Sequence, residues 1–346
     1  MAALRKLARA VACEALFRTG VVASARARTQ DQAKILIYHS VAPQESPYVC
    51  GLEVTVSPSL FEKQLDYLCN NYHIVTLQQL VSGLRQARLS KRTIVLTFDD
   101  GFRDNYELAW PILRKYGVSA TIFLCTDVIG TGKVLWPHRL TYLMNCVGVE
   151  RVLELAEGNW SVPDGISRSL TYLVIINLIA RYVQMTDIET FLQGAFRHFG
   201  IVDPDRASAQ LYLGWAQVEE MMKAGIEFGN HTCSHSNLAL LDQQGQRQEI
   251  IAARDRIIGA VPENLSISFA YPFGQVNHFT DLSEQIVQES GHSCALQGVS
   301  SPIVHGSSVY SLGRIYVAAE SLAQFACRIE GISPGRMLRS LGRAQE

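Results

Sequence analysis

The sequence predicts an α/β fold in which parallel strands alternate with helices. Short runs rich in β-branched and aromatic residues recur along the chain, and most are followed by a segment whose apolar residues fall at helical spacing. This repeated order is typical of a parallel sheet covered by helices. With 346 residues, of which 48% are hydrophobic, the chain is long enough for a (β/α) barrel with insertions.

The expected strands are apolar runs that end at turn or polar residues. They comprise residues 33–38, 73–77, 93–98, 119–128, 226–230, 265–270, 293–297 and 314–317. The expected helices carry ordinary start and stop signals: Ser57 and Pro58 open the first, and Gly117 and Gly225 close two others. The helices comprise residues 57–68, 77–84, 105–116, 215–224, 243–258 and 280–290.

A long helical segment interrupts the alternation. Residues 136 to about 213 contain helical patterns and few strand signals, and residues 170–180 are strongly apolar. We therefore expect a barrel over residues 34–320 with a helical insertion at about 137–213 on its rim. Residues 1–33 would form an N-terminal amphipathic extension, and residues 321–346 a weakly helical, basic tail to which we assign no role.

The N-terminal extension has an apolar face at helical spacing, formed by Leu4, Leu7, Val11 and Ala15. Basic residues lie elsewhere on the helix, namely Arg5, Lys6, Arg9 and Arg18. Such a helix either packs on its own barrel, which we favour, or lies on an anionic membrane surface.

Charge and cysteine usage bound the class of protein. The net charge is −1, so we expect no nucleic-acid partner. The eight cysteines form no C-x-x-C pair, and several lie in strand-like runs, as Cys125 does. Buried free thiols favour a reducing compartment. The expected location is the cytoplasm, with peripheral contact at the inner membrane face as an option and export as the alternative.

The run from Thr93 to Gly101 carries the first chemical signal. An apolar strand ends directly in Asp99 and Asp100, two carboxylates that resist ionising together unless a cation holds the second charge. The alternative is a solvated Asp-Gly turn. The same pattern of a strand ending in reactive groups recurs at His39, at His231 and His235, and at residues 271–274.

His231 and His235 stand four residues apart, so both imidazoles can face one point. With Asp100 they make a set of one carboxylate and two histidines. Three protein ligands with an open fourth position is the arrangement of a catalytic zinc site. A pair of exposed loop histidines is the alternative.

Three motifs in order resemble those of a known family: T-F-D-D-G at 97–101, H-T-x-x-H at 231–235 and Y-P-F-G at 271–274. The chain resembles, over roughly residues 34–318, the polysaccharide deacetylases with a NodB-homology domain (carbohydrate esterase family 4). This resemblance implies a distorted (β/α) barrel of seven or eight strands. It also implies metal-dependent removal of N-acetyl, sometimes O-acetyl, groups from sugars.

The resemblance implies a role for each matching residue. Asp99 would be the general base, and Asp100, His231 and His235 would bind Zn²⁺ or another divalent transition metal. Phe273 would offer its backbone N–H to the oxyanion, within the substrate-side motif formed by Tyr271, Pro272, Phe273 and Gly274.

The chain departs from the family pattern at several positions. Ala270 stands where an arginine that orients the base is usual, and Arg314 is the candidate replacement. The family's Asp-x-x-Trp motif is absent, and Trp136 is the candidate substitute wall of the site. The usual C-terminal acid histidine has only a poor match at His305. His39 fits better, because permuted members of the family carry the acid histidine on the first strand. The alternative is a structural histidine that caps the strand.

The favoured hypothesis is a metal-dependent deacetylase of an amino-sugar glycan or its lipid-linked precursor. The alternative, which Ala270 motivates, is a catalytically impaired glycan-binding protein on the same barrel. A metallophosphoesterase would require more carboxylate and histidine ligands than the sequence shows.

Overall fold

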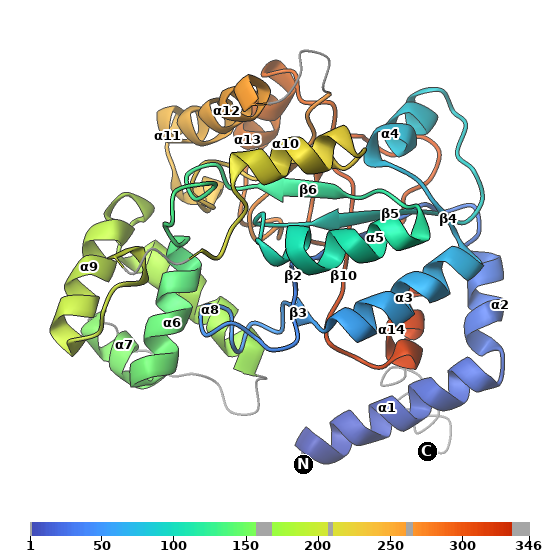
Figure 1. Ribbon diagram of the computed structural model, residues 1–346, viewed down its shortest axis with the longest axis horizontal. Coiled ribbons are helices and arrows are strands. Elements are labelled where there is room, and N and C mark those ends of the chain that lie inside the picture. The colour runs from blue at the N-terminus through green and yellow to red at the C-terminus, as the bar shows by residue number, and fades with distance from the viewer. Residues whose placement is uncertain (1, 157–167, 207–209, 261–265, 334–346) are drawn as a thin grey trace.

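A parallel sheet, curled into a half-barrel and surrounded by helices, forms the centre of the computed structural model, which describes residues 2–156, 168–206, 210–260 and 266–333 (Figure 1). The strands follow the order β10-β1-β5-β6-β7-β8-β9, and β4 pairs with the start of β5. A parallel bridge between Leu296 and Leu312 extends the β9 edge toward the segment that enters β10. The predicted α/β class with a barrel-like sheet is confirmed.

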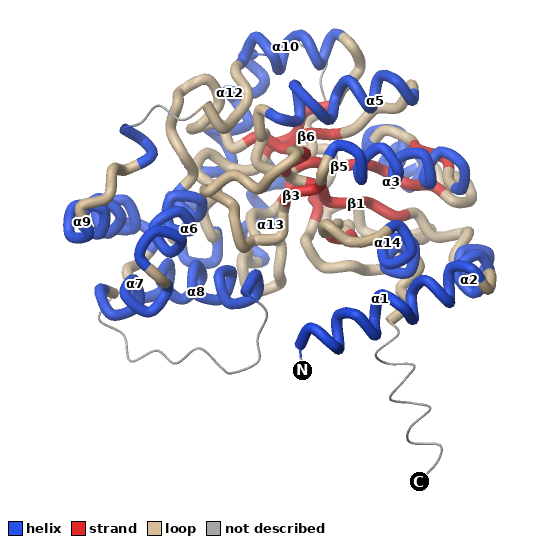
Figure 2. The backbone as a smooth tube through the Cα atoms, turned by 60° about the horizontal axis from the view of Figure 1, so that its bottom comes forward, coloured by secondary structure: helices blue, strands red, loops and turns tan. Residues whose placement is uncertain are grey.

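The strands of the main sheet are β1 (Lys34–Tyr38), β4 (His73–Ile74), β5 (Thr93–Phe98), β6 (Thr121–Leu124), β7 (Glu227–Asn230), β8 (Phe269–Ala270), β9 (Ala295–Leu296) and β10 (Ile315–Tyr316). A separate small sheet joins β2 (Ser40–Val41) and β3 (Thr55–Val56). Every residue of β1 and β5 is buried, because helices or loops cover both faces of the sheet. Figure 2 shows the strands at the centre with helices around them.

The helices that cover the sheet are α3 (Pro58–Asn71), α4 (Leu77–Arg85), α5 (Trp110–Tyr116), α10 (Trp215–Lys223), α11 (Gln243–Arg247), α12 (Ala253–Ala260) and α13 (Asp281–Glu289). One π-helical turn, η1 (Asn105–Ala109), leads into α5, and another, η5 (Gln248–Ala252), joins α11 to α12. Ser57 caps α3 by accepting the Leu60 N–H, and Gly117 ends α5 with a φ of 65°, as the sequence predicts.

The insertion is helical and lies to one side of the sheet (Figure 1). Its helices are α6 (Trp136–Val147), α7 (Val149–Leu155), α8 (Arg168–Tyr182) and α9 (Ile188–Phe199), with short turns η2 (Met185–Asp187) and η3 (Pro204–Arg206). Residues 157–167 and 207–209 of the predicted insertion lie outside the described residues. Arg139 of α6, almost fully buried, pairs with both oxygens of Asp203 at 3.0 and 2.6 Å and so ties α6 to the end of the insertion.

The N-terminal helix α1 (Ala2–Arg18) packs on α14 (Leu322–Ile329) and on the following helix α2 (Val21–Arg28) at one end of the molecule. The predicted apolar face of α1 does not pack on the protein at Leu7 and Val11, which are 62% and 61% exposed. A different side of the helix meets α14, where Cys13 is buried beside Cys327. The side chains of Leu4, Arg5 and Lys6 lie outside the described residues.

The tail segment to which the sequence assigned no role supplies α14, whose apolar face is buried. Among the described helices, none combines the length and apolarity needed to cross a bilayer. Contact of α1 with a membrane surface stays a prediction. Cys13, Cys125, Cys233, Cys294 and Cys327 are buried free thiols, as expected, and a cytoplasmic location likewise stays a prediction.

Candidate active site

Two turns at the carboxyl edge of the sheet bring the paired acids to the paired histidines. Asp99 and Asp100 directly follow β5, and His231 directly follows β7, with His235 four residues later. The Nε2 atoms of His231 and His235 lie 3.7 and 3.5 Å from Oδ1 of Asp100. All three side chains are largely or fully shielded from solvent.

This trio has the donors that a divalent transition metal requires. One ligand atom from each of Asp100, His231 and His235 lies within 4.8 Å of the others. In the described part of the chain Oδ1 of Asp100 is buried without a hydrogen-bond partner. Nδ1 of His231 bonds to the Ala270 carbonyl at 2.7 Å, so its N–H points there and Nε2 is free to bind a metal. The residues present therefore fit a metal ion with two nitrogen ligands and one oxygen ligand.

Asp99 is held apart from this trio by Arg314. The guanidinium of Arg314 donates to both oxygens of Asp99, at 2.7 and 2.8 Å, and the Arg314 side chain is buried. Its Nε also donates to the Gln297 carbonyl at 3.1 Å. The sequence proposed Arg314 as the partner of Asp99 because Ala270 cannot fill that role. The structure places its guanidinium directly on the carboxylate.

The pKa values of the two acids move in opposite directions. Burial alone would raise the pKa of Asp99, but the charge of Arg314, then that of His231, outweighs it and holds this pKa below its ordinary value. Burial, followed by the charge of Asp99, raises the pKa of Asp100 well above its ordinary value. In the metal-free chain Asp99 is therefore the ionised member of the pair, and a cation is needed to hold Asp100 as a carboxylate.

His39 follows β1 at the same edge and is partly buried. Burial lowers its pKa to about 4, and the charges of Asp99 and Arg314 also act on it, the first raising and the second lowering the value. Its Nδ1 is buried and has no hydrogen-bond partner among the described residues. The side-chain amide of Asn105 donates to the His39 carbonyl at 2.7 Å and fixes the backbone there.

The carboxylate of Asp104 secures the next two residues of the same turn. It accepts the Ser40 hydroxyl at 2.6 Å and the Val41 N–H at 3.1 Å. Burial raises the pKa of Asp104 to about 6. The start of η1 thus anchors the turn that carries His39.

The loop of His231 and His235 is held from behind by Glu249 of η5. The Glu249 carboxylate accepts the N–H groups of Cys233 and Ser234 at 3.0 and 2.9 Å and the Ser234 hydroxyl at 2.7 Å. These bonds hold the loop in a conformation that places both imidazoles on one side.

Backbone strain is concentrated in this region. Four non-glycine residues have left-handed backbone, with φ of 70° at Asp100, 69° at Thr232, 61° at His235 and 59° at Phe273. Each such residue costs about 1–3 kcal/mol, and such costs cluster at sites where geometry serves function.

The residues of segment 271–274 differ in how they lie relative to the candidate site. Tyr271 was expected on the substrate side, but its ring stacks on Phe279 at 3.9 Å within a buried core cluster, so that expectation is wrong for the side chain. The Phe273 ring contacts His235 at 4.6 Å between ring centres, and no partner for its N–H is found within the described ranges. A side chain at Gly274 would meet the Gly298 nitrogen at 2.2 Å, so only glycine fits.

Pro272 and Trp136 complete the surroundings of His235. The Pro272 carbonyl accepts the Gly274 N–H at 2.7 Å, which closes the turn under Phe273. Trp136, the first residue of α6, donates its indole N–H to the His235 carbonyl at 3.1 Å and lies 6.0 Å from the Phe273 ring. Trp136 therefore does form a wall beside the histidine loop.

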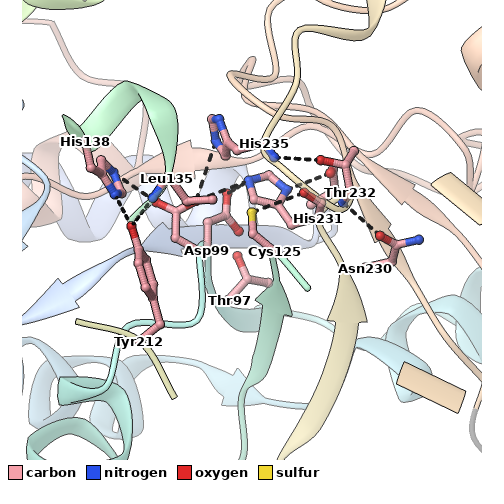
Figure 3. A network of polar contacts seen from close by, with 12 residues as sticks. Thr97, Asp99, Cys125, Leu135, His138, Tyr212, Asn230, His231, Thr232 and His235 are labelled. Carbon is pink, nitrogen blue, oxygen red and sulfur yellow. Dashed lines mark hydrogen bonds and ion pairs between the residues drawn. The ribbon is translucent and has the colours of Figure 1, made fainter. Parts of the chain in front are cut away.

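Two residues of the insertion reach the site that the sequence did not identify. His138 of α6 lies with its Nε2 3.7 Å from Oδ2 of Asp100, and its Nδ1 is 2.7 Å from the Tyr212 hydroxyl. Figure 3 shows His138 and Tyr212 on one side of Asp99 and His231 on the other. The only sequence signal for His138 was its place two residues after Trp136.

Comparison with known proteins agrees with this geometry. The family model described as polysaccharide deacetylase matches residues 86–295. The Bacillus subtilis protein YxkH, named for a polysaccharide deacetylase, is 37% identical over 111 residues, which cover 31% of this chain and 37% of that protein. A poly-β-1,6-N-acetyl-D-glucosamine N-deacetylase of Staphylococcus aureus is 35% identical over 77 residues, or 22% of this chain and 27% of that enzyme. The chain thus spans about a third of the length of these relatives.

Solved structures show the same fold. The deacetylase PplD of Streptococcus pyogenes, in complex with acetate, aligns with a TM-score of 0.54 at 20% identity, over 83% of this chain and 92% of that one. IcaB from Ammonifex degensii aligns with a TM-score of 0.53 at 19% identity, over 87% and 97%.

Proposed function

The chain belongs to the polysaccharide deacetylase family, and on this premise we propose that it hydrolyses acetyl groups of an amino-sugar glycan or its lipid-linked precursor with the help of a divalent metal. One observation carries the proposal: the two adjacent carboxylates, Asp99 and Asp100, lie against different partners. Asp100 faces His231 and His235, whereas Asp99 is paired with Arg314.

Asp100, His231 and His235 would hold the metal. When bound, a cation such as Zn²⁺ lowers the pKa of a water to about 7 and polarises a carbonyl. Asp99 lies beside this position, with Oδ2 3.8 Å from Nε2 of His231, and its lowered pKa keeps it ionised and ready to accept a proton from the attacking water.

Two further groups would act on the acetamide: the Phe273 N–H on its carbonyl oxygen, and His39 on its nitrogen. The N–H of Phe273 would donate to the oxygen as charge develops there, a contribution typically worth about 3 kcal/mol. His39 would deliver the proton that the departing amine needs. Because burial lowers the pKa of His39 to about 4, its imidazole is neutral at neutral pH, so the proton that it delivers would be the one that Asp99 takes from the attacking water; the electrostatic interaction between Asp99 and His39 supports this transfer.

A groove beside Phe273 is suited to the rest of the substrate. Its volume is about 640 Å³, and it is lined by α8 and by the segment that follows Phe273. Amide side chains from both sides could bond sugar hydroxyls, and aliphatic groups could cover sugar faces or a lipid. These residues are Leu173, Val174, Asn177, Gln275, Val276 and Asn277.

The alternative of an impaired glycan-binding protein loses its main ground. It was motivated by Ala270, which leaves the base without the usual arginine. In this chain Arg314 makes the two hydrogen bonds to Asp99 that such an arginine would make.

The proposal is tested by acetate release from N-acetylglucosamine oligomers and from lipid-linked acetylated sugars, together with metal analysis. The wild-type chain should contain about one zinc per molecule and release acetate. His231→Ala should lose both the metal and the activity, and His39→Ala should keep the metal but lose turnover. His73→Ala, an exposed histidine on β4, is the matched control. Equal acetate release by His231→Ala would disprove the metal-dependent mechanism.

A further inference from the structure

His138 occupies a position that the proposed chemistry does not use. The two oxygens of Asp100 face different groups: Oδ1 faces His231 and His235, and Oδ2 faces Nε2 of His138 at 3.7 Å. No hydrogen bond to this carboxylate is found in the described parts of the chain. His138 is therefore the side chain that approaches Oδ2 of Asp100, the oxygen that faces away from His231 and His235.

The orientation of His138 is set by a short chain of hydrogen bonds. The Tyr212 oxygen accepts the Leu135 N–H at 3.2 Å and lies 2.7 Å from Nδ1 of His138. In the tautomer that suits Asp100, the Tyr212 hydroxyl donates to Nδ1, and the proton of the neutral imidazole resides on Nε2. An N–H is thereby directed toward Oδ2 of Asp100.

The insertion is fastened to the Asp100 turn at the same point. Tyr212 pairs with Phe102 in an antiparallel bridge, and the flanking Leu213 N–H donates to the Gly101 carbonyl at 2.9 Å. His138 is thus fixed relative to the residues that directly follow Asp100.

We propose that His138, with its orientation fixed by Tyr212, is a positioning residue for the metal ligand Asp100. It holds Oδ2 of the carboxylate in place, so that Oδ1 stays directed at His231 and His235. This inference rests on the proposed metal site. Outer partners that orient ligands in this way typically contribute about 10- to 100-fold to metal affinity.

The test is the zinc dissociation constant of the full-length chain, measured by competition with a chromophoric chelator, and the visible spectrum of the Co²⁺-substituted chain. His138→Ala should weaken zinc binding by about 10- to 100-fold and alter the Co²⁺ spectrum. His138→Gln places an amide N–H near the former Nε2 and should restore most of the affinity. His198→Ala, an exposed histidine of the same insertion, should bind zinc as the wild type does.

Tyr212→Phe provides a second route if His138→Ala fails to fold. It keeps the imidazole but removes the hydroxyl that sets its orientation, so the zinc affinity should fall between those of the wild type and His138→Ala. Wild-type affinity in either Tyr212→Phe or a folded His138→Ala overturns the inference while the proposed function stands. A wild-type chain that binds no zinc overturns both.

Discussion

The two ends of the central sheet each bury a cluster of ionisable side chains. In only one of these two clusters does every charged group have a hydrogen-bond partner within the chain. At the amino end, Glu330 accepts hydrogen bonds from Lys34 at 2.6 Å, from Thr29 at 2.8 Å and from Tyr72. The Lys34 ammonium also donates to the Thr29 hydroxyl and lies over the Tyr72 ring. Every charge in this cluster has a partner within the chain.

The cluster at the carboxyl end lies about 17 Å away along β1, at a rise of about 3.3 Å per residue. Here Oδ1 of Asp100 and the Nδ1 atoms of His39 and His235 are buried without partners among the described residues. Buried polar atoms are nearly always satisfied, because an unsatisfied one costs free energy. The contrast teaches that the amino-end cluster serves the fold, whereas the carboxyl-end cluster leaves buried polar atoms without a partner in the described chain, which supports the proposed metal site.

The largest effect should come from Asp99→Asn. Loss of the base should lower kcat by about 10²- to 10⁴-fold, while zinc content stays at the wild-type level, because Asp99 is not in the metal trio. The measurements are steady-state acetate release and metal analysis on the same preparation. Near-normal turnover would show that another group takes the proton.

The matched control for this variant is Asp203→Asn. Asp203 is also a buried aspartate bound through both oxygens to an arginine, but it lies in the insertion. Both variants should lose some stability, since each leaves a buried guanidinium short of its partner. Only Asp99→Asn should lose most of its turnover.

At the amino end, Lys34→Met should act on stability and leave chemistry unchanged. It strands the Glu330 carboxylate, whose side chain is fully buried, and breaking a buried pair in this way costs about 3–5 kcal/mol. Denaturant unfolding gives the free energy of unfolding, and kcat is compared at a temperature where both proteins are folded. A tenfold fall in kcat without metal loss would contradict the division of labour between the two ends.

Two further variants sharpen this result. Lys115→Met removes the lysine of an exposed pair with Glu62 and should leave the free energy of unfolding nearly unchanged, because solvent screens this pair. Combining Lys34→Met with Glu330→Gln removes the stranded charge and should recover most of the lost stability.

The sequence predicts the strand-borne part of the site well. Asp99, Asp100 and His231 each follow an apolar strand, and parallel strands place their carboxyl ends at one edge. Arg314 could be suggested because the family position at Ala270 lacks its arginine. The strand lengths were less predictable: residues 119–128 look like one strand, but only Thr121–Leu124 pair with neighbours.

The insertion-borne part could not be predicted. Helical spacing marks α6 as a helix, but which of its residues meets Asp100 depends on how the insertion docks, a long-range property. His138 and Tyr212 are 74 positions apart in the sequence and meet only in the fold. The same limit explains why the sequence could not identify the side of α1 that meets α14, and why it could not show that the Tyr271 ring turns into the core. It also explains α14, whose packing against α1 and whose neighbour Glu330, paired with Lys34, are both long-range contacts.

Stabilisation by zinc addresses the cluster at the carboxyl end of the sheet directly. Zinc at a hundredfold excess over its dissociation constant should add about 3 kcal/mol to the free energy of unfolding. The increment should be the same in Lys34→Met as in the wild type, because that variant leaves the metal trio intact, and absent in His231→Ala. An equal increment in His231→Ala would mean that zinc binds elsewhere.

The pH dependence of this increment has a definite sign. In the metal-free chain the pKa of Asp100 is raised, so above about pH 4 the folded state holds a proton that the unfolded chain has lost. The contribution of Asp100 to stability therefore falls as the pH rises from about 4 through its raised pKa. Bound zinc displaces that proton, so zinc stabilisation should grow across the same window. Thermal unfolding with zinc and with chelator, at a series of pH values, measures the difference, and an increment that shrinks as the pH rises would show that Asp100 is not a ligand.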